Sequence, residues 1–236
     1  MPSSFSANLA VPITHPQRRH ASMKTIALDC DGVLLDYNTA YSKAWFNVFG
    51  ERLVLNNPAA YWPMERWNAR RLVSNELEQF RCAFDHAFWS TIPAVPGALE
   101  ACQRLADQGY NLVCVTALPE KFADARAQNL RDLGFPISRV VTTSNVIVGG
   151  SPKAQAIADL GPVAFVDDYG PYLVGVVPPV HLALILRDPV GSPNAGKLLD
   201  IPDSCHADLL GFADWWLSRE EPWTGQNGES QHGANL

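Results

Sequence analysis

The sequence predicts an α/β protein, a doubly wound parallel sheet with a small helical cap domain. Two observations support this prediction. From residue 24 onward, short apolar runs that are typical of buried strands alternate with segments of helical periodicity. Between residues 37 and 89 no strand-like run occurs, and apolar residues recur at helical spacing. We therefore expect a parallel sheet that is interrupted, after its first strand, by a helical insert.

The first half of the chain contains the first strand and the insert. The strand is expected at residues 24–28, where the side chains are mostly apolar. Helices are expected at 37–49, 64–73 and 75–89, because apolar and aromatic side chains recur there every three or four positions. These helices make up the predicted cap domain, residues 37–90.

In the second half, strands and helices alternate after a Pro- and Gly-rich break. Strands are expected at 111–116, 139–141, 163–166 and 180–186, and helices at 97–108, 119–133, 152–160 and 206–218. The core would comprise residues 24–36 and 91–220. Residues 1–23, which contain no acidic side chain, are expected to form a flexible arm, and the Gly-, Asn- and Gln-rich residues 221–236 a disordered tail.

Composition limits the classes of function. Hydrophobic residues make up 47% of the 236-residue chain, enough for a sizeable core, and the net charge is -6. This charge argues against a nucleic-acid polymer or an anionic membrane as partner, but not against a small phosphorylated substrate. No apolar run approaches the roughly 20 residues that span a bilayer. The five cysteines are odd in number and widely spaced, which favours reduced thiols in a cytoplasmic protein.

Two carboxylates, Asp29 and Asp31, follow the first predicted strand, and Gly32 comes next. Alternate residues of a strand point to the same side, so both are expected to face one small volume at the strand's carboxyl end. Open parallel sheets bind ligands at that edge. Two interpretations follow, and they are compatible. Either one carboxylate acts as a nucleophile while the other transfers a proton, or both carboxylates bind a hard metal such as magnesium. The alternative is a surface turn with solvated acids.

Three further strand ends or helix starts carry polar residues. Thr116 ends a predicted strand, where its hydroxyl and its N–H are suited to a phosphate oxygen. The alternative is that it caps a helix or lies in a turn. Lys153 lies at the start of a predicted helix, where the helix dipole disfavours a cation. A phosphate bound there would offset this effect, so Lys153 is a candidate phosphate ligand. The alternative is a solvated lysine. Asp167 and Asp168 directly follow an apolar strand. Two acidic side chains at the end of a buried strand need a partner, most simply a metal. The alternative is that they cap the next helix.

The order of these residues resembles the four motifs of the haloacid dehalogenase-like (HAD) hydrolase superfamily. The segment Asp29-Cys30-Asp31-Gly32-Val33 resembles the first motif. Thr116, Lys153 and Asp167-Asp168 resemble the second, third and fourth motifs. The resemblance covers residues 24–188 and implies a HAD-like Rossmannoid core. The position of the insert matches the HAD class whose cap closes over the active site.

The resemblance also implies roles. Asp29 would be the nucleophile that forms an aspartyl-phosphate, and Asp31 would be the general acid and then the general base. The phosphoryl oxygens would be held by Thr116, Ala117 and Lys153. The cofactor would be Mg²⁺, bound by Asp29, the backbone carbonyl of Asp31, Asp167 and Asp168. Asp36 matches a frequent position after the first motif, and we interpret it as structural.

Asp31 points to phosphate-ester chemistry, because the dehalogenase branch lacks Asp at this place and transport ATPases have Thr there. The leading hypothesis is a Mg-dependent phosphomonoester hydrolase for a small phosphorylated metabolite. A mononucleotide is the favoured guess for the substrate. The pattern of Pro96-Gly97-Ala98-Leu99-Glu100, Thr116 and Asp167-Asp168 is also similar in part to deoxyribonucleotide 5'-phosphatases. The alternatives are a phosphomutase of the same fold, a non-catalytic phosphate-binding regulatory protein and, less favoured, a dehalogenase.

Three tryptophans of the insert, Trp45, Trp62 and Trp67, suggest a substrate surface. Indole rings stack on a base or a sugar. The alternative is that they pack inside a small helical cap.

Overall fold

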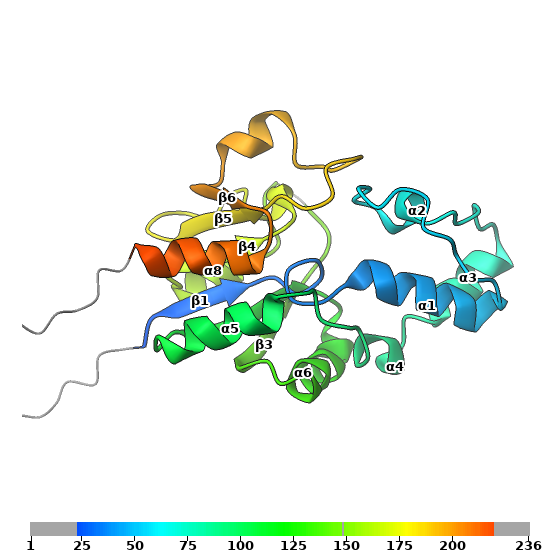
Figure 1. The fold of residues 1–236 in the computed structure, drawn as a ribbon, viewed down its shortest axis with the longest axis horizontal. Coiled ribbons are helices and arrows are strands. Elements are labelled where there is room, and N and C mark those ends of the chain that lie inside the picture. The colour runs from blue at the N-terminus through cyan, green and yellow to red at the C-terminus, as the bar shows by residue number, and fades with distance from the viewer. Residues whose placement is uncertain (1–22, 148, 220–236) are drawn as a thin grey trace, which may run out of the picture.

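The core of the molecule is a parallel sheet with helices on both faces (Figure 1). The computed structural model describes residues 23–147 and 149–219. The expected N-terminal arm, apart from Met23, and the expected C-terminal tail lie outside these residues. Within the described ranges, no helix is long and apolar enough to cross a membrane.

The sheet has six strands in the order β3-β2-β1-β4-β5-β6, and every pairing is parallel. The strands are β1 (Thr25–Leu28), β2 (Asn111–Ala117), β3 (Ile137–Thr143), β4 (Ala164–Asp167), β5 (His181–Ile185) and β6 (Ser204–His206). The doubly wound parallel sheet is therefore confirmed. The sequence pattern did not predict β6, which is only three residues long and half exposed.

The two central strands explain where the site lies. Ile26 of β1 pairs with Leu112 of β2 on one side and with Ala164 of β4 on the other. The chain moves from β1 to β2 and β3, and then crosses back to β4, so the winding direction reverses between β1 and β4. The carboxyl ends of strands at such a reversal form the ligand crevice of open parallel sheets.

Helices cover both faces because β1, β2 and β4 are apolar on both sides. One buried cluster joins the sheet to residues of α5, α6 and α8, and a second joins the opposite face to Ile157 of α7. The core helices are α5 (Ala98–Asp107), α6 (Ala123–Asp132), α7 (Ala154–Leu160) and α8 (Leu209–Ser218). Short 3-10 helices are η1 (Glu120–Phe122), η2 (Gly170–Tyr172) and η3 (Gly196–Asp200).

The insert contains α1 (Tyr37–Phe49), α2 (Pro63–Arg66), α3 (Asn75–Cys82) and α4 (His86–Trp89), which lie together beyond the sheet in Figure 1. The predicted helix at 37–49 is confirmed. Asp36 caps its N-terminus by accepting from the Thr39 N–H at 3.0 Å, and Gly50 ends it with a φ of 69°. The structural interpretation of Asp36 thus agrees with its position.

Two helix predictions in the insert are wrong in extent. The helix expected at 64–73 ends at Arg66, because Asn68 instead pairs with Val54 through its N–H and its side chain, at 3.0 and 2.6 Å. The helix expected at 75–89 is divided into α3 and α4. Asp85 starts α4 by accepting from the Phe88 N–H at 3.0 Å.

Two strand-like crossings join the insert to the core. The Asp36 N–H donates to the Pro93 carbonyl at 2.8 Å, and the Val95 N–H donates to the Leu34 carbonyl at 2.9 Å. The side chain of Asn129 on α6 holds the returning segment with two hydrogen bonds to the Ile92 backbone, at 2.9 and 3.0 Å. Both ends of the insert are therefore fixed close to the end of β1.

Candidate active site

Asp29, Lys153 and Asp167 form a buried charged group at the ends of β1 and β4. The Asp29 N–H donates to the Val166 carbonyl at 2.8 Å, which fixes the residue beside β4. The Lys153 Nζ donates to Asp29 Oδ1 at 2.5 Å and to Asp167 Oδ2 at 2.7 Å. Burial lowers the pKa of Lys153, but the two carboxylates outweigh this and raise it above its ordinary value. The ammonium group thus stays charged between them.

Asp168 completes a group of three buried carboxylates with Asp29 and Asp167. One oxygen from each lies within 4.8 Å of the others. Burial raises the pKa of Asp168 to about 6, although the guanidinium of Arg187 opposes the shift. Burial likewise raises the pKa of Asp167 well above its usual range, although Lys153 opposes this shift. An all-oxygen set with excess negative charge fits a hard divalent cation.

Asp31 lines the same cavity as Asp29. Its Oδ2 accepts from Arg126 Nη2 at 2.9 Å, and Arg126 is fully buried on α6. Burial raises the pKa of Asp31, and the Arg126 charge opposes that rise. Asp31 therefore has an environment different from that of Asp29, which contacts Lys153. Two carboxylates in unlike environments are suited to different chemical roles.

Thr116 and Ala117 lie at the carboxyl end of β2 and line the cavity. Thr116 pairs with Thr142 of the neighbouring strand, so its position is fixed by the sheet register. Lys153 precedes the first residue of α7, and its ammonium group contacts Asp29, which lines the cavity. All six residues that the motifs singled out are thus gathered at one edge of the sheet.

The cavity has a volume of about 410 Å³ and an aromatic wall. Its described lining includes Asp29, Asp31, Thr116, Ala117, Asn145, Ile147, Asp168 and the aromatic residues Tyr37, Tyr61, Trp62, Trp89, Tyr169 and Tyr172. None of these side chains is a lysine, an arginine or a histidine. The described lining therefore offers rings, and no cationic side chain, to the part of a substrate that lies away from the carboxylates.

Of the three tryptophans expected at the substrate, only Trp62 lines this cavity. Trp45 does not line it, because its side chain is 1% exposed and packs against Phe80 and Phe49. Trp67 does not line it either, since its Nε1 donates to the Asn38 carbonyl at 2.9 Å and its ring packs on the core. Both side chains serve to attach the helices of the insert to one another.

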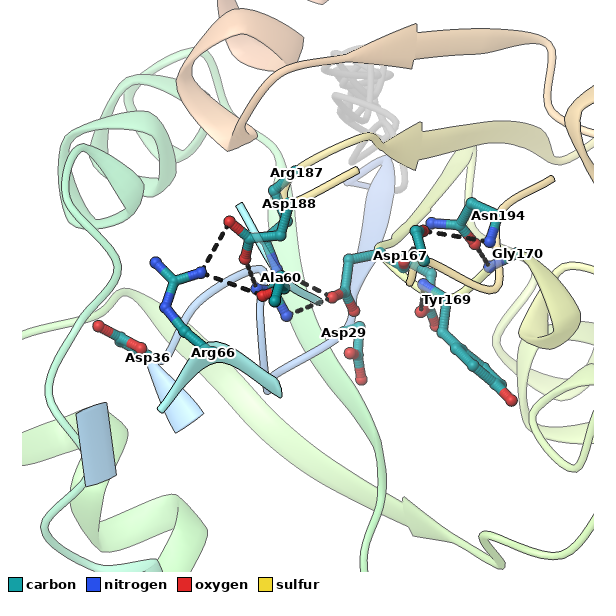
Figure 2. Close-up of polar contacts among 12 residues, drawn as sticks. Asp29, Asp36, Ala60, Arg66, Asp167, Tyr169, Gly170, Arg187, Asp188 and Asn194 are labelled. Carbon is teal, nitrogen blue, oxygen red and sulfur yellow. Dashed lines mark hydrogen bonds and ion pairs between the residues drawn. The ribbon is translucent and has the colours of Figure 1, made fainter. Parts of the chain in front are cut away.

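A chain of ion pairs links the insert to the carboxylates (Figure 2). Arg66 Nη1 contacts Asp188 Oδ1 at 2.9 Å, and Asp188 also pairs with Arg187. Arg187 donates from Nε and Nη2 to Asp168 Oδ2, at 3.0 and 2.7 Å. Gly32 is needed beside this pair, because a Cβ there would lie 2.3 Å from Asp168 Oδ2.

Arg187, Asn194 and Arg126 contact the site but were not predicted. Asn194 holds the loop after β4, since its Nδ2 donates to the Asp168 carbonyl at 2.8 Å and its Oδ1 accepts from Gly170 N–H at 2.7 Å. Arg187 follows an apolar strand directly, which is the signal that singled out Asp167, so the sequence contained an indication. Arg126 lies inside a helical pattern, where nothing distinguishes it from a solvated arginine.

Comparisons with known proteins agree with this architecture. A family model described as haloacid dehalogenase-like hydrolase matches residues 23–168. A search of curated proteins finds no match. A HAD family hydrolase from Deinococcus radiodurans with bound phosphate and sodium is similar in structure, with a TM-score of 0.55, 15% identity and coverage of 83% of this chain and 96% of that one.

Two further solved structures are similar over nearly their whole length. One is a predicted phosphoglycolate phosphatase from Haemophilus somnus, with a TM-score of 0.53, 16% identity and coverage of 82% of this chain and 98% of that one. The other is a candidate beta-phosphoglucomutase from Thermotoga maritima, with a TM-score of 0.53, 17% identity and coverage of 84% and 100%. At such identities the likeness concerns the fold alone, whereas the family model covers most of the chain. The chain belongs to the haloacid dehalogenase-like hydrolase family.

Proposed function

We propose that the chain is a Mg-dependent phosphomonoester hydrolase that acts on a small phosphorylated metabolite through an aspartyl-phosphate. Residues 37–90 would be the cap that closes over the substrate. The observation that carries this proposal is the convergence of Lys153 and two further carboxylates on Asp29, with Asp31 in the same cavity. A nucleophile, a proton donor and a charge-neutralising group are then within reach of one phosphoryl group.

The reaction would proceed in two steps. In the first, an Asp29 oxygen forms a bond to phosphorus, the ester P–O bond breaks, and Asp31 gives its proton to the leaving oxygen. In the second, Asp31 takes a proton from a water molecule whose oxygen attacks phosphorus. The bond between phosphorus and Asp29 then breaks, and inorganic phosphate leaves. Asp31 therefore ends the cycle protonated, as it began.

The remaining residues would hold the phosphoryl oxygens and the cation. Thr116, with its hydroxyl and N–H, the Ala117 N–H and Lys153 are the proposed phosphoryl ligands. Asp29, the Asp31 carbonyl, Asp167 and Asp168 are the proposed ligands of Mg²⁺, which supplies Lewis-acid charge against the phosphoryl oxygens when it is bound. Lys153 would also keep Asp29 and Asp167 from repelling each other before substrate binds.

The cavity wall suggests a class of leaving group. Rings such as Tyr61, Trp62 and Tyr169 favour a flat or apolar group. A second anionic group would lie in this wall without a cationic partner. Asn145, with its amide donor and acceptor, can pair with the edge of a base. We therefore propose a mononucleotide as the favoured substrate, ahead of a phosphorylated acid or a bisphosphate.

The alternative function is a phosphomutase of the same fold. It shares the requirement for Asp31, and a candidate beta-phosphoglucomutase is among the similar structures. A mutase that handles a bisphosphate needs a second phosphate-binding group, and no cationic side chain is part of the described lining. This observation favours the hydrolase.

The test is phosphate release from a panel of phosphomonoesters, with and without Mg²⁺. The panel contains purine and pyrimidine mononucleotides, 2-phosphoglycolate, fructose 1,6-bisphosphate and p-nitrophenyl phosphate. We expect metal-dependent release that is highest with a mononucleotide, and loss of at least about 10³-fold in the Asp29→Asn variant, because the nucleophile is removed.

The matched control is Asp36→Asn, which alters a nearby carboxylate but keeps a good helix cap, so its activity should be normal. Full activity in Asp29→Asn contradicts the mechanism. Isomerised sugar phosphate in place of free phosphate selects the mutase. Binding of phosphate esters without turnover selects the non-catalytic regulatory protein.

A further inference from the structure

Arg126 is an arginine in the interior of the protein, next to the site but outside the cavity wall. Its side chain is 0% exposed, and it extends from the middle of α6. Nη2 donates to Asp31 Oδ2 at 2.9 Å. The guanidinium carbon lies 5.1 Å from the centre of the Trp89 ring, and Trp89 itself lines the cavity. The guanidinium group therefore has one charged partner, Asp31, and one aromatic neighbour.

Most hydrogen-bonding groups of this arginine have no partner within the described part of the chain. Nε and Nη1 of Arg126 are buried without a hydrogen bond, and so is Oδ1 of Asp31. Buried polar groups are normally paired, because an unpaired donor forfeits its bonds to water. Arg187 differs, since its three nitrogens all donate to carboxylates. The burial of Arg126 is thus poorly explained by stability of the fold.

The geometry instead points to a role toward Asp31. We propose that Arg126 is a positioning residue that fixes the Asp31 carboxyl group for proton transfer to the leaving oxygen. The contact at Oδ2 and the packing of the guanidinium on Trp89 set the side-chain rotation of Asp31, whose Oδ1 is buried without a hydrogen bond. The positive charge also stabilises the carboxylate that remains after Asp31 has given up its proton. This inference rests on the proposed phosphatase function.

Leaving-group dependence separates this role from a structural one. An alkoxide is a poor leaving group and needs the proton from Asp31, whereas p-nitrophenolate leaves readily without it. In Arg126→Met we therefore expect kcat for an alkyl monophosphate, such as a mononucleotide, to fall about 100-fold or more. The kcat for p-nitrophenyl phosphate should fall by less than about tenfold. Arg126→Lys, which keeps a donor and a charge, should recover part of the loss on the alkyl ester.

Two further variants sharpen the test. Arg131→Met is the matched control, because Arg131 lies on the same helix but is exposed, and its side chain donates to Gln128 Oε1 at 2.9 Å. The kinetics of this variant should equal those of the wild type. In an Asp31→Asn background, Arg126→Met should cause no further loss of kcat on the alkyl ester, because Arg126 acts through Asp31. If Arg126→Met fails to fold, Arg126→Lys and Arg126→Gln provide the same comparison.

The outcomes separate this inference from the proposed function. Equal losses on both esters, or an additive loss in the Asp31→Asn background, overturn the positioning role and indicate a structural one. Unchanged kinetics in Arg126→Met overturn it as well. A wild-type protein that hydrolyses no phosphoester overturns the proposed function itself, and the positioning role falls with it. A selective, non-additive loss supports both.

Discussion

Lys153 contacts two of the three buried carboxylates at the end of the sheet. Its Nζ lies 2.5 Å from Asp29 and 2.7 Å from Asp167, and the third carboxylate, Asp168, is paired with Arg187. Three carboxylates and two cations leave this group with an excess of one negative charge when all five are ionised. Because the group is buried, this excess is costly and favours binding of a divalent cation.

Metal binding should therefore stabilise the protein measurably. At a Mg²⁺ concentration of 100 times Kd, binding adds about 2.7 kcal/mol to the free energy of unfolding. For a domain of this size, the melting temperature should rise by about 5–10 °C. Asp168→Asn removes a proposed ligand and should abolish most of the rise, as measured by thermal denaturation with and without Mg²⁺. The control Asp36→Asn should keep it. A full rise in Asp168→Asn would show that the cation binds elsewhere.

At the residue scale, the sequence indicates a residue of the candidate site most clearly where a polar side chain ends a strand. Asp29, Thr116 and Asp167 are recognisable because a polar side chain interrupts an apolar run, and the parallel topology then brings such ends together. Arg126 has no such mark. Its burial depends on where α6 lies against the sheet, which local sequence does not specify. The same reason explains Trp45 and Trp67, whose surroundings are set by packing between distant segments.

At the scale of elements, the periodic helices were predicted better than the irregular segments. The helix at 37–49 was predicted with its observed bounds, because Asp36 and Gly50 mark both ends. The segment after Arg66 has helical periodicity but pairs with residues 54–55 instead, through Asn68 and Trp67. Long-range backbone pairing has replaced local preference there, and a single sequence does not reveal the partner.

The contact between α8 and the edge of the sheet predicts a dependence of stability on pH. His181 and His206 each contact Ser204 Oγ at 2.9 Å and pack beside aromatic rings of α8. Burial lowers the pKa of both; Arg219 adds to the shift of His181, and His181 adds to that of His206. The carboxylate of Asp203 opposes the pKa shift of His181, and that of Asp208 opposes the pKa shift of His206.

A histidine with a lowered folded-state pKa binds fewer protons in the folded state than in the unfolded state. Its stabilising contribution is therefore complete above the unfolded pKa of about 6.5 and is lost as the pH falls through and below that value. Asn in place of His206 should make the melting temperature fall less steeply between pH 7 and pH 5 than in the wild type. The control is His86→Asn, because His86 is exposed. This variant should leave the slope of melting temperature against pH unchanged. Equal slopes in all three proteins would contradict this assignment.

At the scale of the whole molecule, two backbone connections between the insert and the core stand out among the contacts of the described residues. One is the pair of crossings at its ends, and the other is a short backbone pairing between the insert and the loop after β5. There the Tyr61 N–H donates to the Val190 carbonyl and the Val190 N–H donates to the Ala59 carbonyl, both at 2.9 Å. Arg66 and Asp188 flank this pairing (Figure 2), and Arg187 extends the contact to Asp168. Opening of the proposed cap would have to break the second connection while the first one bends.

The ion pair between Arg66 and Asp188 should therefore control this opening. Its two side chains are 22% and 16% exposed, so it is less weakened by solvent than a surface pair. In Arg66→Gln we expect hydrogen exchange at the Tyr61 and Val190 amides to accelerate about tenfold, which corresponds to about 1.4 kcal/mol of local stability. Amides of α5 should be unaffected, because the core stays folded. Arg81→Gln removes an exposed pair of the same insert and should leave both amides unchanged. Equal exchange in the two variants would mean that the backbone pairing holds the insert without Arg66.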